Sequence, residues 1–186
     1  LVLDVRSNYE HHLGRFKNAI TLDIDNFYDL PEALKTHPLY LDPQNKSKKI
    51  LTYCTGGVKC ETASSYLQKL GFQHVYQLKG GIINYGHQMK GVDFQGSCYV
   101  FDGRITTHVN QVNPVVISKC WFCNHDCDVA VNCRNSSCDR RMTSCKPCFQ
   151  FQQGCCSLKC ISQGKIRKRT PNYFISGAVN KIAVSN

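Results

Sequence analysis

The sequence lacks any apolar run approaching the roughly 20 residues that a membrane-spanning helix needs, and it opens on no signal peptide. We therefore predict a protein without a membrane anchor, with 186 residues that suffice for one ordinary domain plus a small one. Acidic residues are also scarce, because 13 Asp and Glu stand against 23 Lys and Arg, for a net charge of +10. This excess favours a polyanionic partner such as nucleic acid, and a generic solubility charge accounts for it equally well.

Cysteine is nearly absent from the first half of the chain and abundant in the second. Residues 1–97 contain two of the thirteen cysteines. An odd number of cysteines without a secretory signal argues against a disulfide scaffold and favours metal binding and reactive thiols in a reducing compartment. We therefore expect a cytoplasmic location. Because the chain starts at Leu1 inside a strand-like run, we also expect it to be a piece of a longer protein.

Short apolar runs alternate with helical patterns over residues 1–97. The runs predict strands over 1–5, 19–24, 50–53 and 75–78. The helical patterns predict helices over 31–35, over about 61–70 and from about residue 82, while 42–49 has the composition of a polar loop. This alternation predicts an α/β domain with a parallel sheet. In such sheets the ligand site lies outside the carboxyl ends of the strands.

Cys54 stands at such an end, directly after the strand predicted over 50–53. The glycine-bearing loop after it opens a helix, so backbone N–H groups and the positive end of the helix dipole converge near the thiol. This environment favours the reactive thiolate, and we predict Cys54 as a catalytic nucleophile rather than a buried inert thiol. The predicted active-site loop continues through Thr55, Gly56, Gly57, Val58, Lys59 and Cys60. Cys60 is either a resolving thiol or a bystander.

A cysteine-rich segment from Cys120 to Cys160 is poor in aliphatic residues and needs another source of stability. Eight of its cysteines fall in pairs and match two tetrahedral four-thiolate sites. These predicted metal ligands are Cys120, Cys123, Cys133, Cys138, Cys145, Cys148, Cys156 and Cys160. Such donors select zinc or an iron–sulfur centre, and we predict zinc with a structural role. Unligated structural cysteines and disulfides are the alternatives.

The pairing of these sites is open at this stage. A cross-braced arrangement joins the first pair to the third and the second to the fourth, and a nested one joins first to fourth and second to third. Three further residues can replace a neighbouring ligand, namely Cys127, Cys155 and His125.

Basic residues interleave with aromatics around the cysteines, which suits unstacked RNA bases. A solvated charged face is an equal alternative. The candidate RNA-binding residues are Arg104, Lys165, Arg167, Lys168 and Arg169. Arg104 follows a predicted Asp-Gly hairpin turn, and we favour its pairing with Asp102 over a phosphate contact. We divide the chain into an α/β domain over 1–97, a bridging hairpin over 98–118, a cysteine-rich module over 119–165 and a basic tail over 166–186.

Several segments together resemble rhodanese domains. They are Leu3-Asp4-Val5-Arg6 with Tyr9-Glu10 and the run 14–19, the loop 54–60, and the segment 76–82, which in rhodaneses closes the pocket. Three features are similar to those of one rhodanese subgroup. They are a loop that ends on a second cysteine, the segment 99–104, and a cysteine-rich tail containing 154–157. This subgroup is the rhodanese-related tRNA uridine 5-hydroxylases.

The resemblance implies a rhodanese-like parallel sheet with flanking helices that lacks its first strand, which would precede Leu1 together with an N-terminal domain. It implies oxygen-dependent 5-hydroxylation of the wobble uridine of tRNA, with Cys54 carrying a persulfide or another covalent intermediate and molecular oxygen as co-substrate. Lys59 stands where the family usually has Arg, which keeps the charge and loses the bidentate fork. We expect Asp4 and Arg6 to tie the fold together rather than to touch substrate.

Two other functions compete with this reading. One is a plain sulfurtransferase with a Cys54 persulfide, and the other is a non-enzymatic, zinc-stabilised RNA-binding module. No haem, flavin or histidine–carboxylate iron triad is legible in the sequence, so no organic cofactor is predicted.

Overall fold

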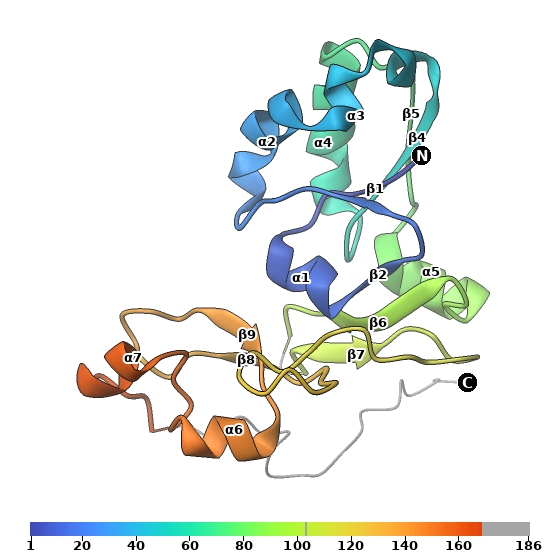
Figure 1. The fold of residues 1–186 in the computed structure, drawn as a ribbon. Coiled ribbons are helices and arrows are strands. Elements are labelled where there is room, and N and C mark those ends of the chain that lie inside the picture. The colour runs from blue at the N-terminus through green and yellow to red at the C-terminus, as the bar shows by residue number, and fades with distance from the viewer. Residues whose placement is uncertain (103, 169–186) are drawn as a thin grey trace.

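The computed structural model describes residues 1–102 and 104–168. Its first part is built around a parallel sheet with strand order β3-β1-β4-β5 (Figure 1). The strands are β1 (Val2–Asp4), β3 (Ile20–Thr21), β4 (Lys49–Tyr53) and β5 (His74–Gln77). Each lies within or across a predicted run, so the predicted α/β architecture with a parallel sheet is confirmed. Strand β3 is shorter than predicted, and a further strand ahead of Leu1 stays a prediction.

Helices connect and cover these strands. They are α1 (Asn8–Leu13), α2 (Leu30–Thr36), α3 (Pro38–Leu41), α4 (Val58–Lys69) and α5 (Gly81–Met89), with 3-10 turns η1 (Phe27–Asp29) and η2 (Pro43–Ser47). The loop predicted over 42–49 was wrong in part, because it contains η2 and the start of β4. Helix α1 was not predicted, because buried polar side chains hide its periodicity. Its detectable signal is a capping box between Ser7 and Glu10.

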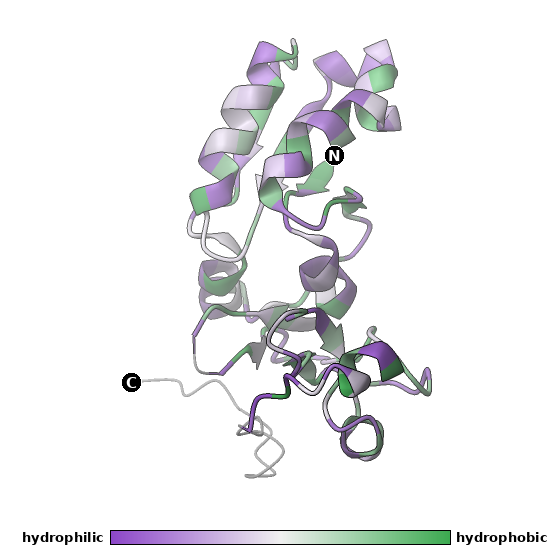
Figure 2. Ribbon diagram, turned by 90° about the vertical axis from the view of Figure 1, so that its left-hand side faces the viewer, coloured by the Kyte–Doolittle hydropathy of each residue, from purple (hydrophilic) through white to green (hydrophobic). Residues whose placement is uncertain are grey.

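The two faces of the parallel sheet bury different partners, as the alternation of side chains along a strand requires. Leu3 and Ile50 face a core shared with α2, α3 and α4. Val2 and Tyr53 face a second core, formed with α5 and the strands below it. The covering helices carry hydrophilic and hydrophobic residues side by side rather than continuous apolar runs, as expected of helices with one solvated face (Figure 2).

A second sheet lies against the face of the parallel sheet that carries Val2 and Tyr53. Strand β2 (Gly14–Phe16) pairs antiparallel with β6 (Phe94–Tyr99), which pairs with β7 (Thr106–His108). The predicted hairpin is therefore present, with Tyr99 opposite Thr106. The first strand of the hairpin, β6, starts earlier than predicted. Because β6 pairs with β2, the hairpin is joined to the α/β part.

The cysteine-rich segment forms a separate lobe beside α1 and β6 (Figure 1). Its elements are β8 (Ala130–Asn132), β9 (Arg141–Thr143), α6 (Lys146–Phe151) and α7 (Leu158–Ser162). One small core contains Val131, Met142 and Phe149, and another consists of cysteines. So little apolar surface cannot stabilise the lobe alone.

A buried ion pair ties the strands together. Asp4 and Arg6 are both 0% exposed, and Arg6 Nη2 donates to Asp4 Oδ2 at 2.7 Å. The Tyr53 hydroxyl also donates to Asp4 Oδ2 at 2.6 Å, and Arg6 Nη2 donates to the Gly14 carbonyl at 2.7 Å. The pair therefore links β1, β4 and β2, which agrees with the expected structural role.

Replacing Asp4 with asparagine should lower the free energy of unfolding by about 3–5 kcal/mol, because it leaves the Arg6 charge buried without its counter-ion. Urea unfolding followed by circular dichroism measures the loss. The matched control is Asp102→Asn, which breaks an Asp–Arg pair with side chains 49% and 50% exposed and should cost less than about 1 kcal/mol. Equal losses in the two variants would contradict the assignment.

Candidate functional site

Cys54 lies directly after β4, at the carboxyl end of the sheet, where the sequence placed it. The loop after it is held in position by the start of α5. Ile82 N–H donates to the Cys54 carbonyl at 3.0 Å, and Ile83 N–H donates to the Thr55 carbonyl at 3.2 Å. Gly81 has φ +65°, and a Cβ there would lie 2.5 Å from both carbonyl oxygens. A glycine is therefore required where α5 closes against the loop.

The Cys54 sulfur accepts hydrogen bonds from the loop and from α4. Gly57, the left-handed N-cap residue of α4, donates its N–H to Sγ at 3.1 Å. The Cys60 thiol also donates to this sulfur. This thiol and the N–H groups of Gly57, Cys60 and Lys59 lower the pKa of Cys54 to about 6, against the opposing effect of burial. The sulfur is thus a thiolate at neutral pH.

The thiolate is enclosed rather than open. Cys54 is 2% exposed and Cys60 is 0% exposed, and both belong to the core under α4. Cys98 is equally buried, but there burial raises the pKa of the thiol to about 11. The N–H donors around Cys54 therefore distinguish this ionised, reactive sulfur from the protonated thiol of Cys98. Above Cys54, Gly56 and Val58 are exposed, and Thr55 is half-buried.

Lys59 makes an ion pair that the sequence analysis missed. Its Nζ donates to Glu10 Oε2 at 2.7 Å, and Glu10 is 0% exposed. The Thr55 hydroxyl lies 3.4 Å from the other oxygen of the same carboxylate. Lys59 therefore neutralises a buried acid at the edge of the site as well as adding positive charge. Phe101, 63% exposed, has its ring centroid 5.5 Å from Lys59 Nζ, so an aromatic side chain also borders the site.

The low pKa of Cys54 predicts the pH dependence of its alkylation. The rate with a small alkylating reagent should rise through about pH 6 and level off near neutrality, because the thiolate is the reacting form and is fully populated above its pKa. An ordinary cysteine would keep gaining rate up to about pH 8.5 or beyond. Peptide mass mapping of the modified residue at each pH gives the measurement, with Cys98 as the internal slow reference. A midpoint above pH 8 for Cys54 would refute the thiolate assignment.

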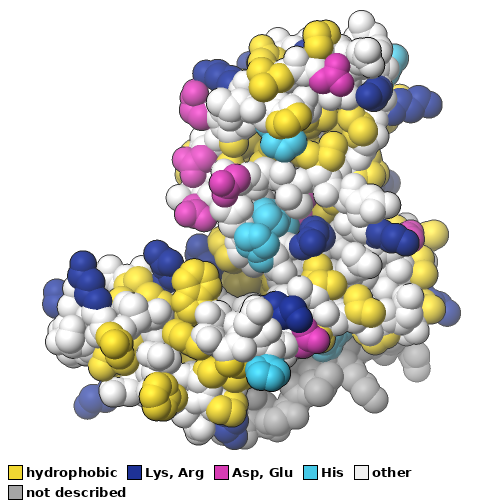
Figure 3. Space-filling view, in the orientation of Figure 1, with side chains coloured by type: hydrophobic (Ala, Val, Ile, Leu, Met, Phe, Trp, Pro, Cys, Tyr) yellow, Lys and Arg dark blue, Asp and Glu magenta, His cyan; other side chains and the backbone are white. Residues whose placement is uncertain are grey.

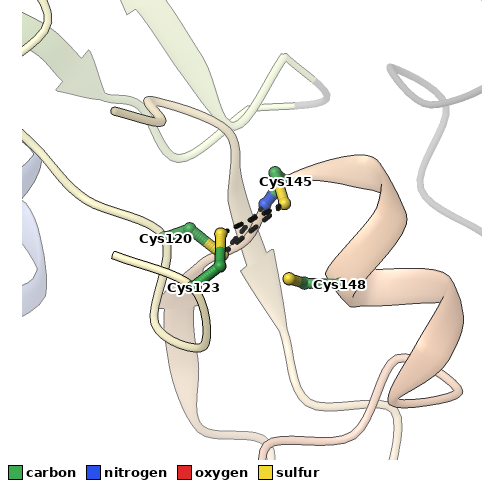
Figure 4. Close-up of side chains that lie close together, drawn as sticks. All are labelled: Cys120, Cys123, Cys145 and Cys148. Atoms are coloured by element: carbon green, nitrogen blue, oxygen red, sulfur yellow. Dashed lines mark hydrogen bonds between the residues drawn. The ribbon is translucent and has the colours of Figure 1, made fainter. Parts of the chain in front are cut away.

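The eight paired cysteines come together in two groups of four. The first contains Cys120, Cys123, Cys145 and Cys148, and the second contains Cys133, Cys138, Cys156 and Cys160. The first pair thus joins the third and the second joins the fourth, which is the cross-braced arrangement. Figure 4 shows the four side chains of the first group pointing toward a common centre, with Cys145 and Cys148 at the start of α6.

The sulfur distances match a metal-centred tetrahedron. The Cys145 sulfur lies 3.7 Å from that of Cys120 and 3.8 Å from that of Cys123. In the second group, the Cys156 sulfur lies 3.7 Å from those of Cys138 and Cys160. A tetrahedron with metal–sulfur bonds of about 2.3 Å has edges of about 3.8 Å. Both groups can therefore hold a metal ion.

The two groups also share a backbone feature. Cys145 N–H donates to the Cys120 sulfur at 3.4 Å, and Cys156 N–H donates to the Cys133 sulfur at 3.4 Å. Such a bond stabilises a thiolate ligand. Cys127, Cys155 and His125, the possible substitute ligands, belong to neither of the metal-binding groups found among the described residues. Both of these cysteines are buried.

The candidate RNA-binding residues that the structure describes are exposed. Arg104 pairs with Asp102 through Nη2 at 2.6 Å, the alternative favoured from sequence. Arg167 donates to Asp139 at 2.6 Å, while Lys165 and Lys168 are exposed. Arg169 lies outside the described residues. On the face drawn in Figure 3, the cysteine-rich lobe carries Lys and Arg side chains. Acidic side chains gather mainly on the α/β part, at the top of the view.

Within residues 1–102 and 104–168, we find no helix with the length and apolarity required to cross a membrane.

The sheet and the cysteine loop at its edge have the organisation of a rhodanese-like domain, and a family model of that description matches residues 1–88. A second model, described as Rhodanase C-terminal, matches residues 95–161. A protein of Cytophaga hutchinsonii called tRNA uridine(34) hydroxylase is 55% identical over 86% of this chain and 50% of its own length. One of the same name from Bacillus velezensis is 44% identical over 86% of this chain and 49% of its own.

A crystal structure of a rhodanese-like domain from Anabaena sp. is 28% identical, with a TM-score of 0.37, and the match covers 46% of this chain and 88% of that domain. The two family models together span most of the described residues. The chain therefore contains a rhodanese-like domain followed by a rhodanase C-terminal region, and over these two regions it is similar to the proteins called tRNA uridine(34) hydroxylase. It spans about half the length of the curated relatives it matches.

Proposed function

We propose that the full protein is a tRNA-modifying enzyme that hydroxylates C5 of the wobble uridine with molecular oxygen, and that Cys54 is its catalytic residue. The observation that carries this proposal is the Cys54 thiolate, held by N–H donors at the carboxyl end of the sheet. The relatives that match 86% of this chain are called tRNA uridine(34) hydroxylase, which supplies the substrate class. The same N–H groups stabilise any anion that forms on or beside the sulfur.

The surface of the cysteine-rich lobe supports a tRNA partner. Residues 119–168 carry nine Lys and Arg against three Asp and no Glu. Trp121 is 56% exposed and lies under the Arg140 guanidinium at 5.6 Å, while Phe101 is exposed beside the catalytic loop. Aromatic faces next to cations suit the unstacked bases of an anticodon loop. The exposed Lys165 and Lys168 are the proposed phosphate contacts, because Arg104 and Arg167 are engaged by Asp102 and Asp139.

We propose zinc as the metal of both four-cysteine groups. Four thiolates leave no open coordination position, so these ions would fold the lobe and take no part in the chemistry at Cys54. The lobe would then act as a separate RNA-presenting unit. A tRNA substrate and reduced thiols together favour a cytoplasmic reaction.

A plain sulfurtransferase is the second candidate. The depressed pKa of Cys54 and the Gly57 N–H suit a persulfide as well as they suit a hydroxylation intermediate. A thiosulfate–cyanide assay with the full-length protein tests it, and absence of turnover would count against it. A purely RNA-binding role is disfavoured by the intact donors around Cys54.

The test of the proposed function is hydroxylation in vitro under isotopically heavy oxygen. The full-length protein, a dithiol reductant and tRNA from a strain lacking the modification are incubated under ¹⁸O₂, and the nucleosides are analysed by mass spectrometry. We expect 5-hydroxyuridine carrying the heavy oxygen atom. Product that contains oxygen from water, or no product under any reducing condition, would overturn the proposal.

A further inference from the structure

Cys54 and Cys60 form a pair of thiols inside the core. Cys60 lies in the first turn of α4 and is 0% exposed, and its thiol hydrogen-bonds to the Cys54 sulfur. A buried cysteine usually serves as a small hydrophobic side chain. Cys60 instead interacts through its thiol with the candidate nucleophile in the same core, and five residues of chain separate the two cysteines.

The proposed reaction needs two electrons from a donor, and a pair of thiols can supply them. Hydroxylation of the uridine C5–H bond by O₂ places one oxygen atom in the product. The other leaves as water, and its release requires two electrons and two protons that the C–H bond does not supply. Two thiols that close to a disulfide give up two electrons and two protons.

We propose that Cys60 is a catalytic residue, the second half of a redox pair with Cys54, and that this dithiol reduces the second oxygen atom to water while it closes to a disulfide. The proposal rests on the proposed function and assigns the electron donor in it. The sum is uridine, O₂ and two thiols giving 5-hydroxyuridine, water and one disulfide.

The bonds change in three steps. O₂ first adds at C5, where the C5–H bond breaks, a C5–O bond forms and the hydrogen ends on the outer oxygen of the resulting hydroperoxide. The Cys54 thiolate then attacks that outer oxygen, so that the O–O bond breaks, an S–O bond forms, and the oxygen left on C5 takes up a proton to become the hydroxyl group. Cys54 is then a sulfenic acid. The Cys60 sulfur attacks the Cys54 sulfur, an S–S bond forms, the S–O bond breaks, and the leaving hydroxide takes the Cys60 proton as water. An external dithiol then reduces the disulfide for the next cycle.

The geometry sets the order of these steps. While Cys54 is a thiolate, the hydrogen bond that Cys60 donates to it, burial and the negative charge of Cys54 raise the pKa of the Cys60 thiol, so Cys60 keeps its proton. Once the Cys54 sulfur is bonded to oxygen it carries no charge, and Cys60 is released to act as a nucleophile. Because the two thiols interact within one core and lie on the same loop and helix start, this attack is intramolecular and is favoured over attack by thiols in solution.

The first experiment needs no substrate. The full-length protein is equilibrated in buffers of reduced and oxidised dithiothreitol, quenched by alkylation and mapped by peptide mass spectrometry. We expect a Cys54–Cys60 disulfide that forms and disappears reversibly across the series. Absence of this disulfide at every potential would overturn the proposal, whatever the activity of the enzyme.

The second experiment follows one turnover. Reduced enzyme and tRNA are mixed without oxygen and without free thiol, oxygen is admitted, and disulfide and 5-hydroxyuridine are counted. Wild type should form one disulfide per hydroxyuridine. In Cys60→Ser, dimedone should trap Cys54 as sulfenic acid, and turnover with limiting dithiothreitol should fall more than tenfold. Cys98→Ala, which removes another buried thiol, should keep the wild-type ratio.

Two results would decide against the redox pair. Turnover by Cys60→Ser at the wild-type rate with no trapped sulfenic acid makes Cys60 a packing residue. Hydroxyuridine formed by wild type without any disulfide assigns the electrons to another donor. If wild type makes no hydroxyuridine even with ample dithiothreitol, the proposed function fails and the electron-donor role is withdrawn with it, while the disulfide of the first experiment is judged separately.

Discussion

Replacing Cys54 with alanine should abolish 5-hydroxyuridine in tRNA, with a loss on the order of 10⁴-fold or more in rate, as expected when the nucleophile of a catalytic unit is removed. The physical reason is that the variant loses the sulfur that the Cys60 thiol and the N–H donors of Gly57, Cys60 and Lys59 hold as a thiolate. The measurement is nucleoside mass spectrometry of tRNA from a deletion strain complemented with the variant.

The controls for this variant separate chemistry from folding. Cys54→Ser keeps the size of the side chain, but its hydroxyl does not ionise near pH 7, so it should be as inactive as alanine. Cys98→Ala removes a thiol that is 0% exposed in the second core and should leave the modification in place. Full modification by Cys54→Ala would place the reaction elsewhere in the protein and remove the basis of the mechanism.

The catalytic loop was predictable because its signals are local. A strand, a cysteine, two glycines and a helix follow one another over residues 49–69, and each acts through its immediate neighbours in the chain. Burial of the sulfur was not predictable, because it depends on Leu67 of α4 and Leu34 of α2 packing into the same core. Glu10 was missed as a partner of Lys59 for a similar reason, since 49 residues separate them.

The metal groups show the same division. The spacing within each cysteine pair is local and identified all eight ligands that the structure brings together. The choice between cross-braced and nested pairing depends on contacts distant in sequence. Trp121 N–H donates to the Thr143 carbonyl at 2.9 Å, which brings the first pair to the third, and Arg134 N–H donates to the Gly154 carbonyl at 2.9 Å, which brings the second to the fourth.

Removing one metal should unfold the cysteine-rich lobe while the α/β part stays folded. Zinc contributes an apparent 10–16 kcal/mol to the folding of small zinc domains, far more than the small core around Phe149 can supply. Wild type should contain two zinc ions per chain by elemental analysis, and Cys123→Ser should contain one or none. Hydrogen exchange should show β8 and β9 unprotected in the variant and β1 and β4 unaffected.

The matched control is Cys127→Ser, a buried cysteine outside both groups, which should keep two metals. Iron with labile sulfide in the wild type, or two zinc ions retained by Cys123→Ser, would contradict the assignment.

The cross-braced arrangement also predicts that the two metal ions are released together. Cys133 directly follows β8 and binds in the second group, whereas Cys145 lies just beyond β9 and binds in the first. The paired strands β8 and β9 are therefore shared by both sites. Loss of either ion frees one end of this hairpin and weakens the other site, so a chelator titration should release both zinc ions in one cooperative step. Two separate steps, each with its own affinity, would show that the sites fold independently.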